Sequence, residues 1–268
     1  MSNTILGSIL LGIIEGLTEF LPVSSTGHLI LASWLLDYDA PWLAAFEVMI
    51  QLGAILAVCV AYFAKLWGTV VTLPSDDQSR RFALGIIIAF LPAASLGAVF
   101  HDFIDSVLFS PVVVSVALVL GGIVILVVER LLPRVRYTHS DDLPLRIALG
   151  IGICQTVSLI PGVSRAGATI IGALLLGVER KAAAEFSFFL AVPTMLGAFV
   201  FSAYTKWAEL TAASDAFLII AVGFVTAFIA AMAVVQTFIA FVGRYGFAPF
   251  AWYRIAVGLV MMGFLWMS

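Results

Sequence analysis

Six apolar stretches of the chain are each long enough to cross a membrane as a helix. A hydrocarbon core about 30 Å thick takes a helix of about 17 to 25 residues. Hydrophobic residues make up 63% of the 268 residues and charged residues 11%, far from the roughly 25% charged content of soluble domains. The sequence therefore predicts an all-α polytopic membrane protein, with transmembrane helices over 42–64, 82–100, 108–129, 182–204, 216–242 and 249–267. No basic segment precedes the first apolar run, so we expect the N-terminal segment to be retained.

Two further apolar regions, 4–36 and 146–179, are each interrupted by proline, in the sequences "FLPVSS" and "LIPGVS". Proline removes a helical hydrogen bond and breaks a helix interior. The pieces after the breaks, 24–36 and 164–178, would extend only about 20 to 22 Å, which is too short to cross alone. We therefore interpret both regions as re-entrant helix pairs.

The distribution of lysine and arginine supports this interpretation, because cytoplasmic loops collect basic residues. The predicted loops 65–81 and 130–146 carry seven of the 13 Lys and Arg residues. Arg180, Lys181 and Arg244 fall on the same side as these loops only if each broken region enters and leaves by one face. The first pair then enters from the outside and the second from the cytoplasm.

The two halves of the chain also resemble each other. A shift of about 140 residues lays Pro22 near Pro161 and Gly27 on Gly167. Since the two pairs enter from opposite sides, the sequence predicts an inverted-topology repeat, an architecture that places sites at the middle of the membrane. The repeats cover about 4–129 and 146–268 within a single membrane domain over 1–268.

The segment "EGLTEFLPVSSTGH" at 15–28 is the most polar part of an apolar region. Glu15 and Glu19 are four residues apart, so their carboxylates share one helix face. An ionised residue in a membrane costs about 2.5 to 3.5 kcal/mol on insertion scales and indicates a functional site. Two adjacent carboxylates repel each other unless a hard cation such as Mg²⁺ or Ca²⁺ accepts both as ligands. We expect a divalent metal ion on Glu15 and Glu19, with an ion pair to Arg165 as the alternative or in addition.

Each break is followed by a new helix, whose first N–H groups and positive dipole attract phosphate. An arginine adds a planar fork of donors that matches phosphate oxygens. Ordinary N-capping is the alternative for the hydroxyls, and His28, one turn into its helix, is a candidate proton carrier near neutral pH. The predicted phosphate-binding residues are Ser24, Ser25, Thr26, Ser164, Arg165 and Thr169.

These parts together indicate phosphoryl transfer, in which positioning and charge stabilisation dominate catalysis. A transporter or flippase of an anionic lipid is the alternative, because inverted repeats with broken helices are a transporter architecture. The carboxylate pair disfavours transport, since two negative charges beside an anionic substrate make sense mainly with a metal ion. Gly121 and Gly122 could serve helix packing within one chain or between two.

The segments "EGLTEFLPVSSTGH" at 15–28 and "PGVSRAGATI" at 161–170 resemble the signature segments of the undecaprenyl pyrophosphate phosphatase family of the bacitracin-resistance type. The resemblance extends over almost the whole chain, including "FEVMIQLGAILAV" at 46–58 and "EFSFFLAVPTMLGA" at 185–198. It implies a multi-pass enzyme of the bacterial inner membrane that converts C55 polyprenyl pyrophosphate to the monophosphate carrier of peptidoglycan synthesis and confers bacitracin resistance. The expected partners are this lipid substrate and membrane lipids, but no nucleic acid. The sequence leaves the oligomeric state open, with a homodimer as one possibility.

The resemblance also assigns site residues. The acidic pair falls on Glu15 and Glu19, the histidine on His28, and the remaining positions on Ser24, Ser25, Thr26, Ser164, Arg165 and Thr169. The catalytic set is Glu15, Glu19, Ser25, His28 and Arg165, in a site expected to open to the periplasm. The nucleophile stays open: we favour Ser25 with His28 as its base, over direct attack by His28 or by a metal-bound water.

Overall fold

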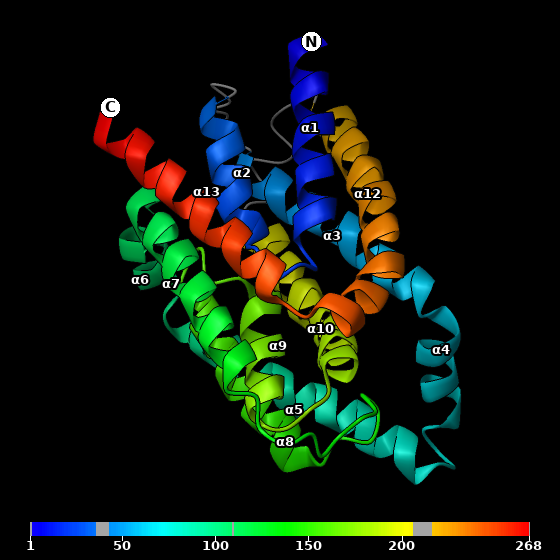
Figure 1. Ribbon diagram of the computed structural model, residues 1–268. Helices are drawn as coiled ribbons and strands as arrows, with labels where there is room; N and C mark the ends of the chain where they lie inside the picture. The colour runs from blue at the N-terminus through cyan, green and yellow to red at the C-terminus, as the bar shows by residue number, and fades with distance from the viewer. Residues whose placement is uncertain (1, 36–42, 109, 206–215, 268) are drawn as a thin grey trace.

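The computed structural model describes residues 2–35, 43–108, 110–205 and 216–267, and these residues are helical almost throughout (Figure 1). The prediction of an all-α polytopic membrane protein is confirmed. Within the described ranges five helices are long and apolar enough to cross a membrane, and α3 becomes a sixth when counted with α4, from which it is bent by 74°. The long helices are α3 (Leu43–Ala61), α5 (Asp77–Val99), α7 (Pro111–Arg130), α10 (Arg180–Thr205), α12 (Ala216–Tyr245) and α13 (Ala248–Met267).

Both proline-interrupted regions are broken where the sequence predicts. The first forms α1 (Ser2–Thr18) and α2 (Ser25–Leu35), and the second forms α8 (Leu145–Gln155), the 3₁₀ turn η2 (Thr156–Leu159) and α9 (Arg165–Leu175). In Figure 1 the blue first pair and the green second pair approach each other from opposite ends of the bundle. An inverted repeat requires its two broken pairs to enter from opposite ends in this way. The repeat itself and its boundaries stay predictions.

Polar contacts gather the loops that we predict to be cytoplasmic at one end of the molecule. Glu129 at the end of α7 accepts two hydrogen bonds from the Arg180 guanidinium, at 3.0 and 3.1 Å, and one from the backbone N–H of Phe247. The segment before α8 bonds to the segment after α9, from Arg136 N to Gly177 O at 2.8 Å. The second broken pair therefore begins and ends at the same end of the bundle.

The predicted loop 65–81 is wrong over its first part, because the chain forms the helix α4 (Phe63–Thr72) there. Its apolar residues recur with helical spacing at 63, 67, 70 and 71 and are exposed, and the rings of Phe63 and Trp67 stack at 6.1 Å. Lys65, on the same helix, forms an ion pair with Asp141, with 3.2 Å between Nζ and Oδ2. This amphipathic pattern was hidden by its position between basic residues. The remaining short elements are α6 (His101–Phe103) and the π-helix η1 (Ile104–Leu108).

Small residues allow the helices to approach closely. A Cβ atom added at Gly12 or Gly16 of α1 would lie 2.6 or 2.3 Å from a backbone oxygen of α12, and one at Gly122 of α7 would lie 2.7 Å from Ala251 O on α13. Gly122 thus serves packing within the chain, one of the two roles that the sequence left open.

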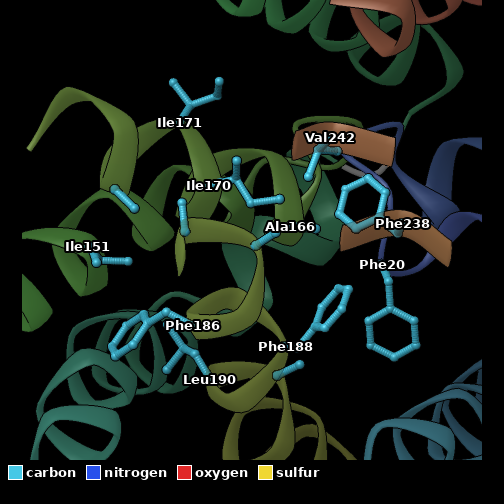
Figure 2. Close-up of a cluster of buried hydrophobic side chains, with 14 of the residues drawn as sticks. Phe20, Ile151, Ala166, Ile170, Ile171, Phe186, Phe188, Leu190, Phe238 and Val242 are labelled. Carbon is cyan, nitrogen blue, oxygen red and sulfur yellow. The ribbon is translucent and has the colours of Figure 1, made fainter. Parts of the chain in front are cut away.

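A buried apolar cluster is formed by residues of both broken regions together with residues of α10 and α12 (Figure 2). Phe20, Ala166 and Phe188 each follow a polar residue in the chain, namely Glu19, Arg165 and Ser187, and each is at most 1% exposed. The rings of Phe20 and Phe188 meet edge to face at 5.3 Å between centroids. Packing of these neighbours fixes the backbone from which the polar side chains project.

Candidate active site

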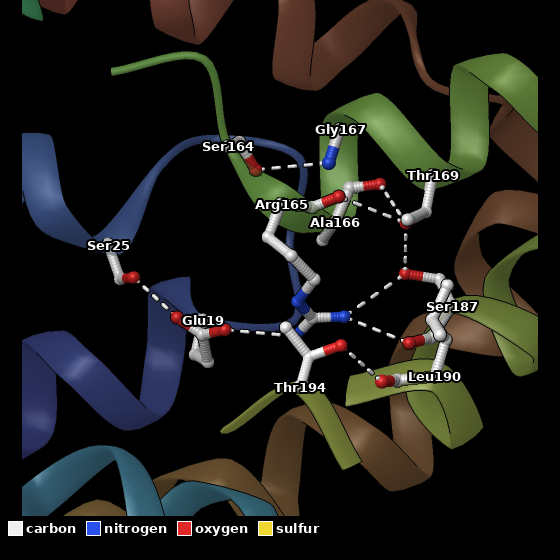
Figure 3. Close-up of polar contacts among 10 residues, drawn as sticks. All are labelled: Glu19, Ser25, Ser164, Arg165, Ala166, Gly167, Thr169, Ser187, Leu190 and Thr194. Carbon is white, nitrogen blue, oxygen red and sulfur yellow. Dashed lines mark hydrogen bonds and ion pairs between the residues drawn. The ribbon is translucent and has the colours of Figure 1, made fainter. Parts of the chain in front are cut away.

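An ion pair joins the two breaks. Arg165, the first residue of α9, donates from Nη2 to Glu19 Oε1 at 2.9 Å, although 146 residues separate them. Nη1 donates to the backbone and side-chain oxygens of Ser187 on α10, at 2.9 and 3.3 Å (Figure 3). The guanidinium is thus held between the two halves of the chain, which confirms the ion pair that the sequence left as one of two options for the carboxylates.

Ser25, the first residue of α2, donates its hydroxyl hydrogen to the other carboxylate oxygen, Glu19 Oε2, at 2.5 Å (Figure 3). Both residues are buried, at 5% and 7% exposure. Because an ionised carboxylate only accepts hydrogen bonds, Glu19 both pairs with Arg165 and is placed to take the proton of Ser25.

Thr169, one turn into α9, lies on the far side of the arginine from Glu19. Its Oγ1 is 2.7 Å from Ser187 Oγ and 3.0 Å from Arg165 O, to which it donates. It is fully buried. Thr169 therefore supports Ser187 and the first turn of α9.

Each break ends in a serine with the same unusual backbone. Ser24 has φ 69° and Ser164 has φ 76°, and they are the only non-glycine residues with positive φ among those described. Each hydroxyl accepts from the N–H three residues on, Gly27 at 3.4 Å and Gly167 at 3.0 Å. A left-handed conformation is costly for a residue with a Cβ atom. The two serines thus cap α2 and α9, as the N-capping alternative expects, and present both helix N-termini to the space between the breaks.

That space is a cavity of about 200 Å³. Its lining comes from both breaks and from α3, η2 and α10. The residues are Glu19, Ser24, Ser25, Thr26, Gln51, Ser158, Pro161, Gly162, Ser164, Arg165, Thr194, Met195 and Ala198. Six predicted site residues therefore share one cavity with helix N-termini, hydroxyls and a guanidinium, which is a suitable environment for a phosphate group.

Glu15 lies behind Glu19 and does not line the cavity. It is fully buried, and neither of its carboxylate oxygens accepts a hydrogen bond from an N–H or hydroxyl donor among the described residues. Its electrostatic neighbours are Glu19, Glu47 and Arg165. A buried carboxylate without a partner is costly, so this position suits a bound cation or a proton. The part of the chain that the structure describes has no group of three or more His, Cys, Asp or Glu residues placed to hold a metal ion, and a metal ion here would need further oxygen ligands, such as those of phosphate or water that Mg²⁺ commonly has.

His28 is placed away from Ser25. Its Nδ1 lies 2.8 Å from Ser24 O and its Nε2 lies 2.8 Å from the hydroxyl of Tyr253 on α13. The two rings stack at 5.5 Å. Since a carbonyl oxygen only accepts, Nδ1 carries a hydrogen. The structure brings Glu19, and not His28, to the hydroxyl of Ser25.

Sequence reasoning missed several residues of this region. Ser187 lies within "EFSFFLA", which carries part of the family resemblance but no predicted site residue, and Gln51 and Ser158 lie within apolar runs. Isolated polar residues inside apolar stretches were the available signal, since polar groups in a membrane face the protein interior. Their partners become evident only once the helices are packed.

Comparison with known proteins gives a consistent result over nearly the full chain. The family model described as bacitracin resistance protein BacA matches residues 8–260. The chain is 53% identical over 256 residues to undecaprenyl-diphosphatase 2 of Paramagnetospirillum magneticum, covering 96% of this chain and 97% of that one. It is 56% identical over 251 residues to undecaprenyl-diphosphatase of Sphingopyxis alaskensis, covering 93% and 94%. It is also 51% identical over 260 residues to undecaprenyl-diphosphatase 1 of Mesorhizobium japonicum, covering 97% and 96%.

Proposed function

The chain belongs to the bacitracin resistance protein BacA family, and we propose that it is an undecaprenyl-diphosphatase that removes the terminal phosphate of C55 polyprenyl pyrophosphate. Relatives about half identical over nearly the full chain carry this enzyme name. The product would be the monophosphate that serves as lipid carrier in peptidoglycan synthesis, and removal of the substrate would give bacitracin resistance.

The observation that carries this proposal is the contact between Arg165 of the second break and Glu19 of the first. It makes one site of two segments that are far apart in the sequence. The same cavity offers the N-termini of α2 and α9, so a pyrophosphate would meet positive charge from both halves of the chain.

In our proposal Ser25 is the nucleophile and Glu19 its base. Ser25 Oγ bonds to the terminal phosphorus while its proton passes to Glu19 Oε2, its hydrogen-bond partner. The bond between that phosphorus and the bridging oxygen breaks, and the lipid monophosphate leaves. Glu19 passes this proton to the departing monophosphate and is again a carboxylate. It then takes a proton from a water molecule whose oxygen bonds to the phosphorus. The bond to Ser25 Oγ breaks, Glu19 returns the proton to that oxygen, and phosphate is released. Arg165 and the helix N-termini would stabilise the charge on the phosphoryl oxygens.

Glu15 and Glu19 would hold a divalent ion, Mg²⁺ or Ca²⁺. The unpaired buried oxygens of Glu15 beside a second carboxylate support this proposal. When bound, the ion would offset the negative charge of the pyrophosphate and polarise a phosphoryl oxygen.

The protein is a multi-pass membrane protein. For its location we propose the bacterial inner membrane, with the site open to the periplasm. The basic loops lie at the end of the bundle opposite the end from which the first broken pair enters, which supports this orientation under the positive-inside rule. A homodimer stays a prediction.

The test is phosphate release by the purified protein in detergent. We expect release from C55 pyrophosphate and little from C55 monophosphate, because the site is built to cleave the terminal anhydride. Absence of release from folded, metal-supplied protein would contradict the proposal. Translocation of lipid in proteoliposomes under the same conditions would then favour the transporter alternative.

A further inference from the structure

Arg254 of α13 is the largest fully buried side chain of the described residues, with 1% exposure. A guanidinium carries five N–H donors, and here each has a backbone oxygen to bind. Nε donates to Leu118 O at 3.4 Å, and Nη2 donates to Ala117 O at 3.2 Å and Gly162 O at 2.9 Å. Nη1 donates to Pro22 O at 3.0 Å and Val163 O at 2.9 Å.

Three of these acceptors belong to the breaks themselves. Pro22 lies in the first break, two residues before Ser24, while Gly162 and Val163 immediately precede Ser164 in the second. The carbonyl groups of a broken helix lack their usual helical partners and must be satisfied inside the protein at membrane depth. One side chain therefore ties both breaks together and anchors them to α7.

The fold makes room for this side chain with glycine. A Cβ atom at Gly121 of α7 would lie 2.1 Å from Arg254 Nη2, and one at Gly167 of α9 would lie 3.2 Å from Nη1. Gly121 thus serves contact within the chain. Lysine could not replace the arginine here, since its ammonium has three donors at one point and no planar fork.

No carboxylate among the described residues pairs with Arg254, and its hydrogen-bond acceptors are all backbone carbonyl oxygens. Carbonyl dipoles compensate a cation only in part. Since Gly162 also lines the cavity, the remaining positive charge lies at the break, where an anion would be bound.

We propose that Arg254 is a positioning residue for the proposed phosphatase reaction. It sets the spacing of the two breaks, and with it the geometry in which the N-termini of α2 and α9, Ser25 and Arg165 meet a pyrophosphate group. The kinetic part of this inference rests on the proposed function. The affinity for inorganic pyrophosphate can be measured without any turnover.

The experiment compares Arg254→Lys with the wild-type protein in two assays, phosphate release from C55 pyrophosphate and calorimetric binding of inorganic pyrophosphate. We expect the variant to fold, with kcat at least about tenfold lower and a pyrophosphate Kd at least about tenfold higher. A tenfold change in Kd corresponds to a loss of about 1.4 kcal/mol of binding free energy. Arg180→Lys is the matched control, since Arg180 pairs with Glu129 at the far end of the bundle, and both values should stay near wild type.

Gly121→Ala is the second variant, for the case that Arg254→Lys does not fold. It keeps the arginine and displaces its guanidinium, and we expect the same two losses. Gly263→Ala of α13, where an added Cβ would meet nothing within 4 Å, is its control. Wild-type kcat and pyrophosphate affinity in both variants would overturn the inference. A loss of activity explained by a smaller folded fraction, with unchanged pyrophosphate affinity, would overturn it as well.

The two proposals fail differently. A wild-type protein that binds pyrophosphate but releases no phosphate contradicts the phosphatase function, and the binding assay still decides the role of Arg254. A wild-type protein that neither binds pyrophosphate nor hydrolyses the lipid contradicts both.

Discussion

Arg165 Nη2 lies 2.9 Å from Glu19 Oε1, and this contact between residues 146 positions apart joins the two helix breaks. The carboxylate side chain is 6% exposed and the arginine side chain 12%. At such burial, loss of either partner leaves a charge without its counterpart. Neither Glu19 nor Arg165 can therefore be replaced by a neutral residue without disturbing the site. Oε1 of Glu19 pairs with Arg165, and Oε2 accepts the hydrogen bond from Ser25.

Ser25 and its neighbour Ser24 should respond very differently to substitution. Ser25→Ala removes the proposed nucleophile, and we expect kcat to fall by at least about 1,000-fold, as for loss of other nucleophiles. Ser24→Gly removes a cap but suits the positive φ of that position, and a glycine cap costs only a few tenths of a kcal/mol. We expect Ser24→Gly to keep most of the activity. Equal losses in phosphate release would contradict the assignment.

Glu15→Gln tests the metal proposal. The amide removes a buried charge that has no partner, so the thermal midpoint should stay equal or rise. The concentration of Mg²⁺ or Ca²⁺ that gives half-maximal activity should rise at least about tenfold, as for weakened metal sites, and a chelator should abolish activity in both proteins. Glu129→Gln, at the far end of the bundle, should lower the thermal midpoint without changing the metal requirement. An unchanged metal requirement in Glu15→Gln would remove Glu15 from the metal site.

His28 and Tyr253 should act as a unit. Tyr253→Phe removes the hydroxyl that meets His28 Nε2 and keeps the stacked ring. One neutral hydrogen bond is worth about 1 kcal/mol, so we expect kcat/KM to fall less than about tenfold. His28→Gln should lie in the same range. A loss in His28→Gln as large as that of Ser25→Ala would restore His28 as the base.

The packing of α1 against α12 can be tested with two glycines. Gly16→Ala places a methyl group 2.3 Å from Ala227 O, so the thermal midpoint should fall by several degrees. Gly68→Ala in α4 meets nothing within 4 Å and gains up to about 1 kcal/mol of helix propensity, so its midpoint should stay or rise. Equal midpoints for the two variants would show that α1 does not need this close approach.

Much of this fold could be predicted from hydropathy and proline alone. In a membrane an apolar run of sufficient length has few options besides a helix. Pro22 and Pro161 predicted the breaks, although Pro92 and Pro193 lie inside the continuous helices α5 and α10. The amphipathic α4 was missed because Lys65 and the following Arg80 and Arg81 resemble a polar loop.

The site was predicted in its parts and not in its contacts. Glu19, Ser25 and Arg165 stand out as polar residues beside prolines in apolar sequence. Arg254 is an isolated charge within the predicted helix 249–267, which is the same kind of signal. Its role could not be predicted, because its acceptors are backbone oxygens up to 232 residues away and depend on how α13 packs. The orientation of His28 was likewise unpredictable, because Tyr253 competes for its ring.

The most direct test of the central claim, that two breaks form one phosphoryl-transfer site, is a double-mutant cycle on Glu19→Gln and Arg165→Met. The quantity measured is kcat/KM for phosphate release from C55 pyrophosphate. If the two residues act in one site, each single variant should lose at least about 100-fold, and the double variant should lose little more than the worse single variant. Losses that multiply in the double variant, or a single variant with wild-type activity, would show that the two breaks do not work as one site.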